Sequence, residues 1–333
     1  MRLLTIVVVV LAALYSGYWW LGARAVAGAA ESQITQLRAD GWTVEYDALD
    51  TKGYPSRFDT TATNLTLSSP DAQVQYTAPR VQALALSYQP NRVILAFPDA
   101  QAVTVPQIGT VDVTSSGLRA SAEVGVATSL PLRNVTAEAL SMTLETPVGL
   151  EISLQNLLGA LREGSGAANT YDVYLGAQDI APPAALMAQI NRDGLLPETL
   201  SVAKIDATVT LDRPLNRESL SAWQRDPGQV QALTLRDLAL TWGTLMINGS
   251  GAVTIGADGV PEGEITIKAN DWQRMLNIAV AAGAIPQDAV FVAQGMGQLL
   301  SLGAADLTLP IKFANGRWSV GPSDLGPAPR FPR

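Results

Sequence analysis

Hydrophobic residues follow two different patterns along this chain, and the pattern changes near residue 42. Residues 3–21 form an uncharged apolar run, LLTIVVVVLAALYSGYWWL, which follows Arg2. At a rise of about 1.5 Å per residue this run reaches about 28 Å, close to the hydrocarbon thickness of a bilayer. It therefore predicts one membrane-spanning helix within residues 1–24.

Aromatic residues close this apolar run. Tyr18, Trp19 and Trp20 stand at its end, and rings with an apolar body and a polar edge prefer the membrane interface. We therefore expect these three residues to be interface anchors. A cleaved signal peptide is the alternative, because Ala25-Val26-Ala27 resembles a small-residue cleavage site.

A short tail before the apolar run and a long sequence after it predict that the bulk of the chain is translocated. We expect a single-pass protein of the inner (cytoplasmic) membrane with most of its chain in the periplasm, or a soluble periplasmic protein if the segment is cleaved. Arg2 precedes the run while Arg24 and Arg38 follow it, so the distribution of positive charge does not decide the orientation.

Residues 25–41 keep a helical spacing of apolar positions and end at a glycine, which predicts a connecting amphipathic helix. From Trp42 the spacing becomes two. Short alternating runs separated by Gly, Pro, Asn, Asp or Ser fill residues 42–152 and predict the first β-rich half as an antiparallel meander with one polar face.

Residues 153–198 are predicted to be more helical, with NLLGALREG and PPAALMAQINRDG as candidate helices. Residues 199–321 form the second β-rich half, in which Lys204–Asp212 alternates without a break and helices are expected at about 271–302. Pro310 suggests an edge position for the strand around it, and residues 322–333 are predicted to be an irregular, proline-rich tail.

Together these elements predict an α+β, predominantly β fold: an N-terminal transmembrane helix followed by a large curved antiparallel sheet with a few covering helices. With 333 residues, one long sheet-based domain or two closely joined ones are both compatible with the chain length.

Composition excludes several classes of site. The chain contains no histidine and no cysteine, so Ser-His, Cys-His and zinc sites cannot form in their usual arrangements. Ser201-Val202-Ala203-Lys204 matches S-x-x-K but leads into a strand and lacks the partner motifs of β-lactamases. We therefore expect no enzyme, no cofactor and no metal.

Charge is informative about partners. After Arg24 the chain contains 20 of its 22 lysines and arginines, all but Arg2 and Arg24, and all 30 acidic residues, so this part carries a net charge of −10. A negative body argues against nucleic-acid binding. The expected partner is the membrane through the N-terminal helix, with lipid or envelope proteins as further candidates.

One local motif stands between the first two predicted strands. Its members are Gly53, Tyr54, Pro55, Arg57 and Phe58. Glycine and proline turn the chain sharply, the two rings are expected to be buried on either side of the turn, and the arginine is expected to bind free carbonyl groups there. The motif is predicted to be a structural corner; a docking contact near the membrane is the alternative.

Several features of the chain carry a family resemblance: the apolar helix followed by G-Y-P-x-R-F, and the motifs Trp242-Gly243, Gly259-Val260-Pro261-Glu262-Gly263, Asn270-Asp271-Trp272 and Leu309-Pro310-Ile311. In these features the chain resembles the bacterial family called domain of unknown function 2125 (DUF2125). The second half is also distantly similar to AsmA-like envelope proteins, in which long curved sheets with an apolar inner face are associated with lipid movement. The resemblance implies no catalytic residue, and the short chain makes a bridge between two membranes doubtful.

Two functions remain open from the sequence. The first is a binding protein whose sheet shields lipid or another apolar ligand, and the second is a structural or assembly factor that recruits envelope proteins through sheet edges. An accessible apolar groove longer than about 15 Å favours the first, whereas a filled core and a long bare edge strand favour the second. The possible groove residues are Ile205, Val209, Leu211, Ile265, Ile267, Leu307, Leu309 and Phe313.

Overall fold

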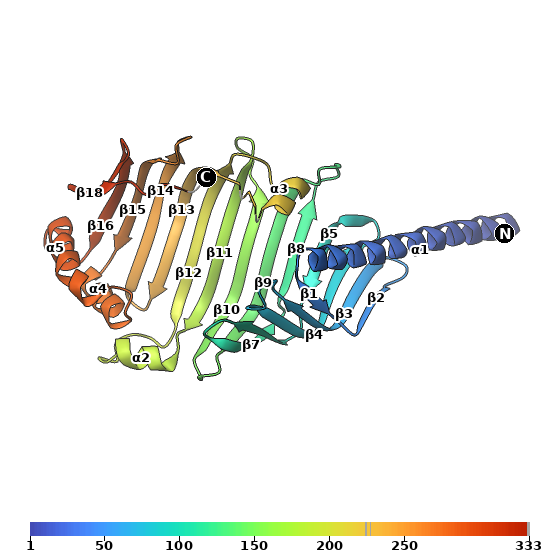
Figure 1. Cartoon of the computed structure of the whole chain (residues 1–333), viewed down its shortest axis with the longest axis horizontal. Coiled ribbons are helices and arrows are strands. Elements are labelled where there is room, and N and C mark those ends of the chain that lie inside the picture. The colour runs from blue at the N-terminus through green and yellow to red at the C-terminus, as the bar shows by residue number, and fades with distance from the viewer. Residues whose placement is uncertain (224, 227, 332–333) are drawn as a thin grey trace. The chain divides into compact units, whose positions relative to one another are not determined.

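The computed structural model describes residues 1–223, 225–226 and 228–331, and Figure 1 shows its helices and strands. The chain divides into two compact units. Unit 1 comprises residues 1–125 and 137–149, and unit 2 comprises residues 126–136 and 150–333. The predicted helical middle therefore belongs to the second unit.

Unit 1 begins with one helix of 38 residues, α1 (Arg2–Ala39). The expected anchor and connecting helix are continuous, and the helix ends before Gly41, whose φ of 89° lies in the left-handed region that favours glycine. The strands that follow are β1 (Thr43–Glu45), β2 (Ala48–Lys52), β3 (Arg57–Ser68), β4 (Gln75–Leu86), β5 (Gln89–Ala96), β6 (Ala100–Val105), β7 (Gly109–Ser116), β8 (Arg119–Val124) and β9 (Leu132–Glu145).

Strand β4 organises unit 1. It pairs along its length with β3, while its C-terminal half pairs with β5 and its N-terminal end pairs with β6. Beyond this branch β5 pairs with β8, β6 with β7, and β7 with β9, all antiparallel. This branched arrangement differs from the simple meander that the sequence predicted.

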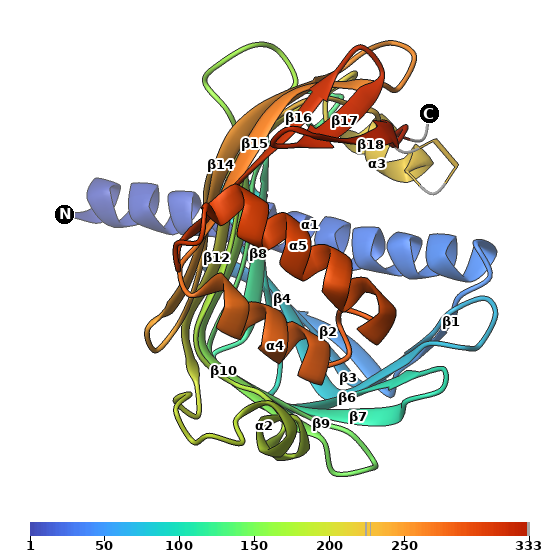
Figure 2. The same ribbon diagram turned by 90° about the vertical axis from the view of Figure 1, so that its left-hand side faces the viewer.

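Unit 2 is a regular antiparallel meander in which each strand from β10 to β18 pairs with the next. Figure 2 shows that its strands curve and that two helices, α4 and α5, lie on the concave side. The strands are β10 (Glu151–Glu163), β11 (Thr170–Ala181), β12 (Leu200–Leu211), β13 (Val230–Trp242), β14 (Leu245–Ile255), β15 (Pro261–Ala269), β16 (Leu307–Ala314), β17 (Arg317–Val320) and β18 (Ser323–Pro327).

Helices occupy the connections of unit 2. Those predicted at PPAALMAQINRDG and at about 271–302 are confirmed. A short helix also lies in NRESLSAWQRD and begins with a capping box at Asn216; Gln224 of that stretch lies outside the described residues. The helical elements are α2 (Ala184–Ile190), α3 (Arg217–Ala222), α4 (Trp272–Ala281), the 3₁₀ turn η1 (Gln287–Ala289) and α5 (Val290–Ser301).

The predicted fold class is confirmed: a long apolar helix is followed by large antiparallel β-structure with a few helices. Three local predictions are wrong. NLLGALREG lies in strand β10, the predicted irregular tail contains strand β18, and β16 is not an edge because it pairs with both β15 and β17.

Pro310 is compatible with this central position because it lies where the β16–β17 register ends. The register with β17 runs only from Ile311 to Ala314. Pro310 itself contributes only its carbonyl oxygen, which accepts a hydrogen bond from Gly321 N at 3.0 Å. The missing proline N–H therefore costs this register no hydrogen bond.

Candidate functional site

All eight predicted groove residues share one face of unit 2. The register pairs Ile265 with Ile311 and Ile267 with Leu309, and side chains two residues apart on a strand point to the same face. On β12 the same alternation places Ile205, Val209 and Leu211 on one face. The remaining groove residues, Leu307 and Phe313, lie on that face of β16.

This apolar face is wider than the sequence suggested. Leu161 on β10 pairs with Val173 on β11 and Leu175 pairs with Ile205 on β12. Leucines of β13 continue the same rows, because Leu238 pairs with Ile205. We define the concave face of unit 2 by these rows and the eight residues above; its β13 members are Leu233, Leu235, Leu238 and Leu240.

Helices α4 and α5 cover one end of the concave face. Trp272 and Leu276 of α4 form a buried cluster with Leu307 of β16, and the Trp272 indole N–H donates to Ala304 O at 3.2 Å. Gly297 of α5 lies against the same ring, where a Cβ would be 2.3 Å from it. Leu307 and its neighbour Leu309 are therefore part of a filled core.

Two further clusters close the concave face toward the strand ends. At one end Trp242 is buried with Leu196 and Leu245, and helix α2 packs on them. At the other end Leu211 is buried, and Tyr171 is buried with its hydroxyl accepting a hydrogen bond from Leu215 N at 2.7 Å.

Between these clusters the concave face is accessible to solvent. Leu175 is 53 % exposed and Ile205 is 42 % exposed, and the two are direct partners on β11 and β12. Two adjacent large apolar side chains that remain exposed between covered regions form a candidate interaction surface. We call this pair and its neighbours Val173 and Leu238 the apolar window.

The opposite, convex face of unit 2 is polar and carries an ion-pair network. Arg236, in a bulge of β13, contacts Asp206 and lies 2.6 Å from Asp172 Oδ1. Arg162 lies 3.1 Å from the other oxygen of Asp172. The Arg236 guanidinium is the main reason that the pKa of Asp172 lies below its usual value, and hydrogen bonds from Thr208 and Arg162 lower it further.

This network predicts a pH-dependent contribution to stability. Because the pKa of Asp172 is lower in the folded chain than in the unfolded chain, its contribution is present above the unfolded value near 3.9 and is lost as the pH falls below it. We expect Asp172→Asn to destabilise unit 2 by about 1 kcal/mol at pH 7. Urea unfolding at pH 7 and pH 3 measures this difference, which should be smaller at pH 3 because that pH lies below the unfolded pKa; Glu262→Gln, on the same face, is the control and should show no pH-dependent loss.

The corner motif of unit 1 contacts helix α1. Trp19 Nε1 donates to Arg57 O at 2.9 Å, and its ring lies against Tyr54 (5.4 Å, edge to face) and Phe58 (6.0 Å). Tyr15 Oη donates to Pro55 O at 2.9 Å.

Hairpin β4–β5 meets the same part of the helix. Tyr18 Oη donates to Ser87 O at 2.7 Å. The helix backbone also approaches the corner closely, because a Cβ on Gly22 would lie 2.6 Å from the Phe58 ring. The corner and the end of the apolar run are therefore packed together.

The expected roles of these motif residues are only partly confirmed. Phe58 is 3 % exposed, as predicted, but Tyr54 is 56 % exposed. The Arg57 side chain does not bind carbonyl groups; its Nε donates to Asp59 Oδ2 at 3.0 Å and its Nη2 contacts the same oxygen. Tyr18 and Trp19 hydrogen-bond to unit 1, whereas Trp20 stays exposed and stacks under Arg24; their role as interface anchors stays a prediction.

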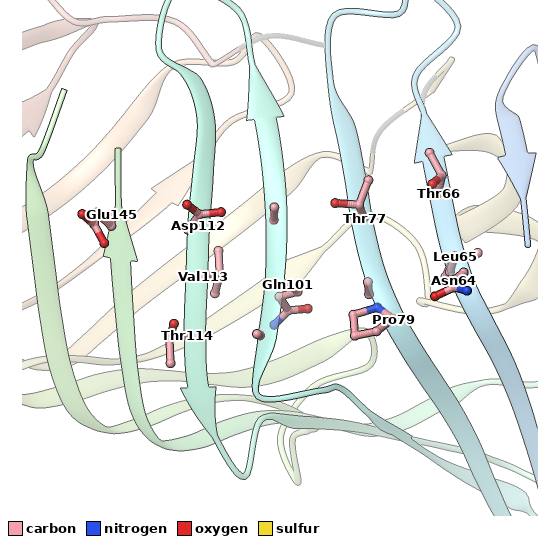
Figure 3. Close-up of a pocket in the computed structure, with 13 residues that line it drawn as sticks. Asn64, Leu65, Thr66, Thr77, Pro79, Gln101, Asp112, Val113, Thr114 and Glu145 are labelled. Atoms are coloured by element: carbon pink, nitrogen blue, oxygen red, sulfur yellow. The ribbon is translucent and has the colours of Figure 1, made fainter. Parts of the chain in front are cut away.

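A cavity of about 680 Å³ lies within unit 1, and several polar groups are part of its lining. Figure 3 shows Asp112 and Glu145 on neighbouring strands and Thr77 beyond the strand of Gln101, and the register pairs Asp112 with Glu145. Gln101 accepts a hydrogen bond from Tyr76 Oη at 2.6 Å, and burial raises the pKa of that phenol to about 12. No sequence pattern indicated this cavity, because its polar residues come from five strands.

This arrangement offers hydrogen-bonding groups to a polar ligand. In the described part of the chain no group of three or more histidine, cysteine, aspartate or glutamate residues is placed to hold a metal ion.

The N-terminal helix is the one described helix long and apolar enough to cross a membrane. Comparison with known proteins gave no match among curated proteins and no match among solved structures. Residues 19–329, nearly the whole chain after the apolar run, match the family described as "Uncharacterized protein conserved in bacteria (DUF2125)". The chain belongs to the DUF2125 family of bacterial proteins.

Proposed function

We propose that this protein is a non-catalytic, membrane-anchored protein of the bacterial cell envelope that holds a lipid acyl chain or another apolar ligand on the concave face of unit 2. The observation that carries the proposal is the apolar window, in which Leu175 and Ile205 remain exposed on an otherwise covered apolar face. An apolar ligand that covers this window removes its side chains from water, which stabilises the complex by about 25 cal/mol per Å².

The dimensions of the concave face suit an acyl chain. Strand β12 has 12 residues, which correspond to about 40 Å at about 3.4 Å per residue. The strands β10 to β13, of which β13 meets α4 at Trp242, extend about 14 Å across at about 4.8 Å per strand. These are the dimensions of the whole face; clusters around Leu211 and Trp242 cover its two ends, so an acyl chain would lie across the apolar window between them.

Retention of the N-terminal helix as an anchor is supported by its contacts with unit 1. Cleavage after Ala27 would remove Trp19 and Gly22 and would expose the buried ring of Phe58. A signal peptide that is discarded has no reason to complete the core of the mature protein. We therefore favour a single-pass protein of the inner membrane with both units in the periplasm.

The alternative, recruitment of envelope proteins through sheet edges, has less support. Among the described residues β18 pairs only with β17. It has five residues and ends at Pro327; a short edge strand with proline discourages pairing with another chain. A protein partner remains the second candidate because α5 exposes the apolar side chains Phe291, Val292 and Leu299.

The acyl-chain proposal predicts the effect of charge in the window. Leu175→Asp combined with Ile205→Asp should weaken binding of a fluorescent fatty acid by tenfold or more, because a carboxylate next to the acyl chain loses water without gaining a partner. Fluorescence titration of the full-length protein in detergent measures the dissociation constant. Organic extraction and native mass spectrometry of the protein from its envelope fraction identify the natural ligand.

A matched control is available on the opposite face of the same unit. Met246 is 46 % exposed on the convex face of β14, so Met246→Asp adds the same charge without touching the window. Equal affinity of the wild-type protein and the window variant would exclude the window as the binding site. No bound lipid and no titratable affinity would leave the assembly function as the better explanation.

A further inference from the structure

A separate cavity of about 330 Å³ lies on unit 1 beside the corner motif. It lies against the neighbouring strands β3, β4 and β5, and its floor is apolar while its rim carries two arginines. The register places these side chains on one face, since Arg57 pairs with Leu86 and Leu84 pairs with Ile94. The lining residues that matter here are Arg57, Arg92, Leu84, Leu86, Ile94 and Gln89.

The two guanidinium groups differ in what already binds them. Arg57 uses Nε and Nη2 on Asp59, which fixes its orientation and leaves Nη1 free to donate. Arg92 has no ion pair in the described part of the chain; Glu123 is its backbone partner on β8. Neither carboxylate lines the cavity, although Asp59 stands opposite Leu84 and Glu123 opposite Arg92 in the register. Asp59 compensates the charge of Arg57, so Arg92 is the cation of the rim without an ion pair among the described residues.

The cavity lies at the end of β3 and β4 whose backbone contacts α1, on the face of these strands opposite to Phe58. Arg57 O accepts the hydrogen bond from Trp19, and Ser87, next to Leu86, accepts the one from Tyr18. Figure 1 shows the N-terminal part of α1 continuing beyond the strands of unit 1. Tyr88, in the same hairpin, is 68 % exposed, and exposed aromatic residues at this level are typical of the headgroup layer.

We propose that this cavity binds the phosphate of an anionic phospholipid from the membrane that holds α1. Arg57 and Arg92 donate to the phosphate oxygens, and the first acyl methylene groups lie on Leu84, Leu86 and Ile94. Arginine suits this task because its planar fork matches phosphate geometry. The bound lipid then fixes the corner against the headgroup layer.

This inference rests on the membrane anchoring proposed above and is independent of ligand binding by unit 2. The test uses the full chain reconstituted in nanodiscs of phosphatidylcholine with 20 % phosphatidylglycerol, followed by native mass spectrometry of the lipids retained after release. Co-elution with the nanodisc in size-exclusion chromatography reports anchoring separately. Failure of co-elution contradicts the anchor, whereas co-elution without selective lipid retention contradicts only this site.

Arg57→Gln and Arg92→Gln should each reduce retained phosphatidylglycerol by about tenfold, the loss expected from one charge-assisted hydrogen bond. Arg80→Gln is the control, since Arg80 lies on the same strand and face as Leu84 but about 14 Å away, and it should retain as much lipid as the wild type. Equal retention by all variants overturns the proposal. Calorimetric titration with inorganic phosphate in phosphatidylcholine nanodiscs distinguishes a lipid phosphate from free phosphate. We expect no binding of free phosphate. Binding to the wild type that is lost in Arg92→Gln would assign the site to free phosphate and overturn the lipid proposal.

Discussion

Replacement of Trp19 by alanine is expected to lower the free energy of unfolding of unit 1 by about 3 kcal/mol. The substitution removes the hydrogen bond to Arg57 O and the ring contacts with Tyr54 and Phe58, and loss of a large aromatic side chain from a packed site costs about 3–5 kcal/mol. Partial exposure of Trp19 places the expected loss at the lower end of this range. Urea unfolding of the full-length protein in detergent, followed by far-UV circular dichroism, measures it.

Trp20 provides a control of the same type at the next position. It is 51 % exposed and contacts Arg24 by a cation–π interaction, which contributes about 0.5–1 kcal/mol at an exposed site. Trp20→Ala should therefore change the unfolding free energy by at most about 1 kcal/mol. If Trp19→Ala lowered the unfolding free energy as little as Trp20→Ala, the helix would not be part of the folded unit. A cleaved signal peptide would then again explain the apolar run.

The corner motif illustrates how far sequence reasoning reaches. Glycine and proline predicted the turn, and Phe58 was correctly expected to be buried because an aromatic residue beside a turn needs cover. The partner of the motif could not be predicted, because the helix residues that cover Phe58, Trp19 and Gly22, lie more than 30 residues away in the sequence. They belong to a stretch whose pattern predicts a membrane span. The carbonyl groups expected to bind Arg57 are instead reached by side chains of that helix.

The error at β10 has a different origin. NLLGALREG contains good helix formers, and its apolar spacing does not distinguish a short helix from a strand. Leu161 and Arg162 become strand residues because β11 offers them the partners Val173 and Asp172. Tertiary pairing here overrides local propensity, as is common for sheet residues.

The residues that form the concave face could be predicted from the sequence, but the exposure of each side chain could not. Alternation along each strand placed Ile205 and Ile265 on one face, because a period of two fixes the direction of every side chain. Which of them would be covered depends on the positions of α2, α4 and α5, and no pattern in the strands themselves contains that information. Sequence therefore identified a candidate apolar surface, whereas the structure limits the accessible part to the apolar window.

Replacement of Trp272 by alanine is expected to destabilise unit 2 by about 4 kcal/mol, the largest effect predicted for this unit. Trp272 is 5 % exposed and packs with Leu276 and Leu307, while Gly297 of α5 lies flat on its ring. Its removal leaves a cavity that α5 cannot fill without moving, and buried tryptophan-to-alanine changes cost about 3–5 kcal/mol. Differential scanning calorimetry of the full-length protein in detergent should show a lower unfolding temperature.

Phe291→Ala is the control that distinguishes loss of core packing from loss of an exposed apolar ring. It lies on α5 but is 84 % exposed, so Phe291→Ala removes a ring of similar chemistry without opening the core and should leave the unfolding temperature nearly unchanged. Trp272→Ala should also increase exchange of amide protons in α4 and α5 while leaving β11 and β12 protected, because the cluster joins these helices to β16. Unchanged exchange in the two helices would show that they are held by other contacts, and the covered end of the concave face would then be independent of Trp272.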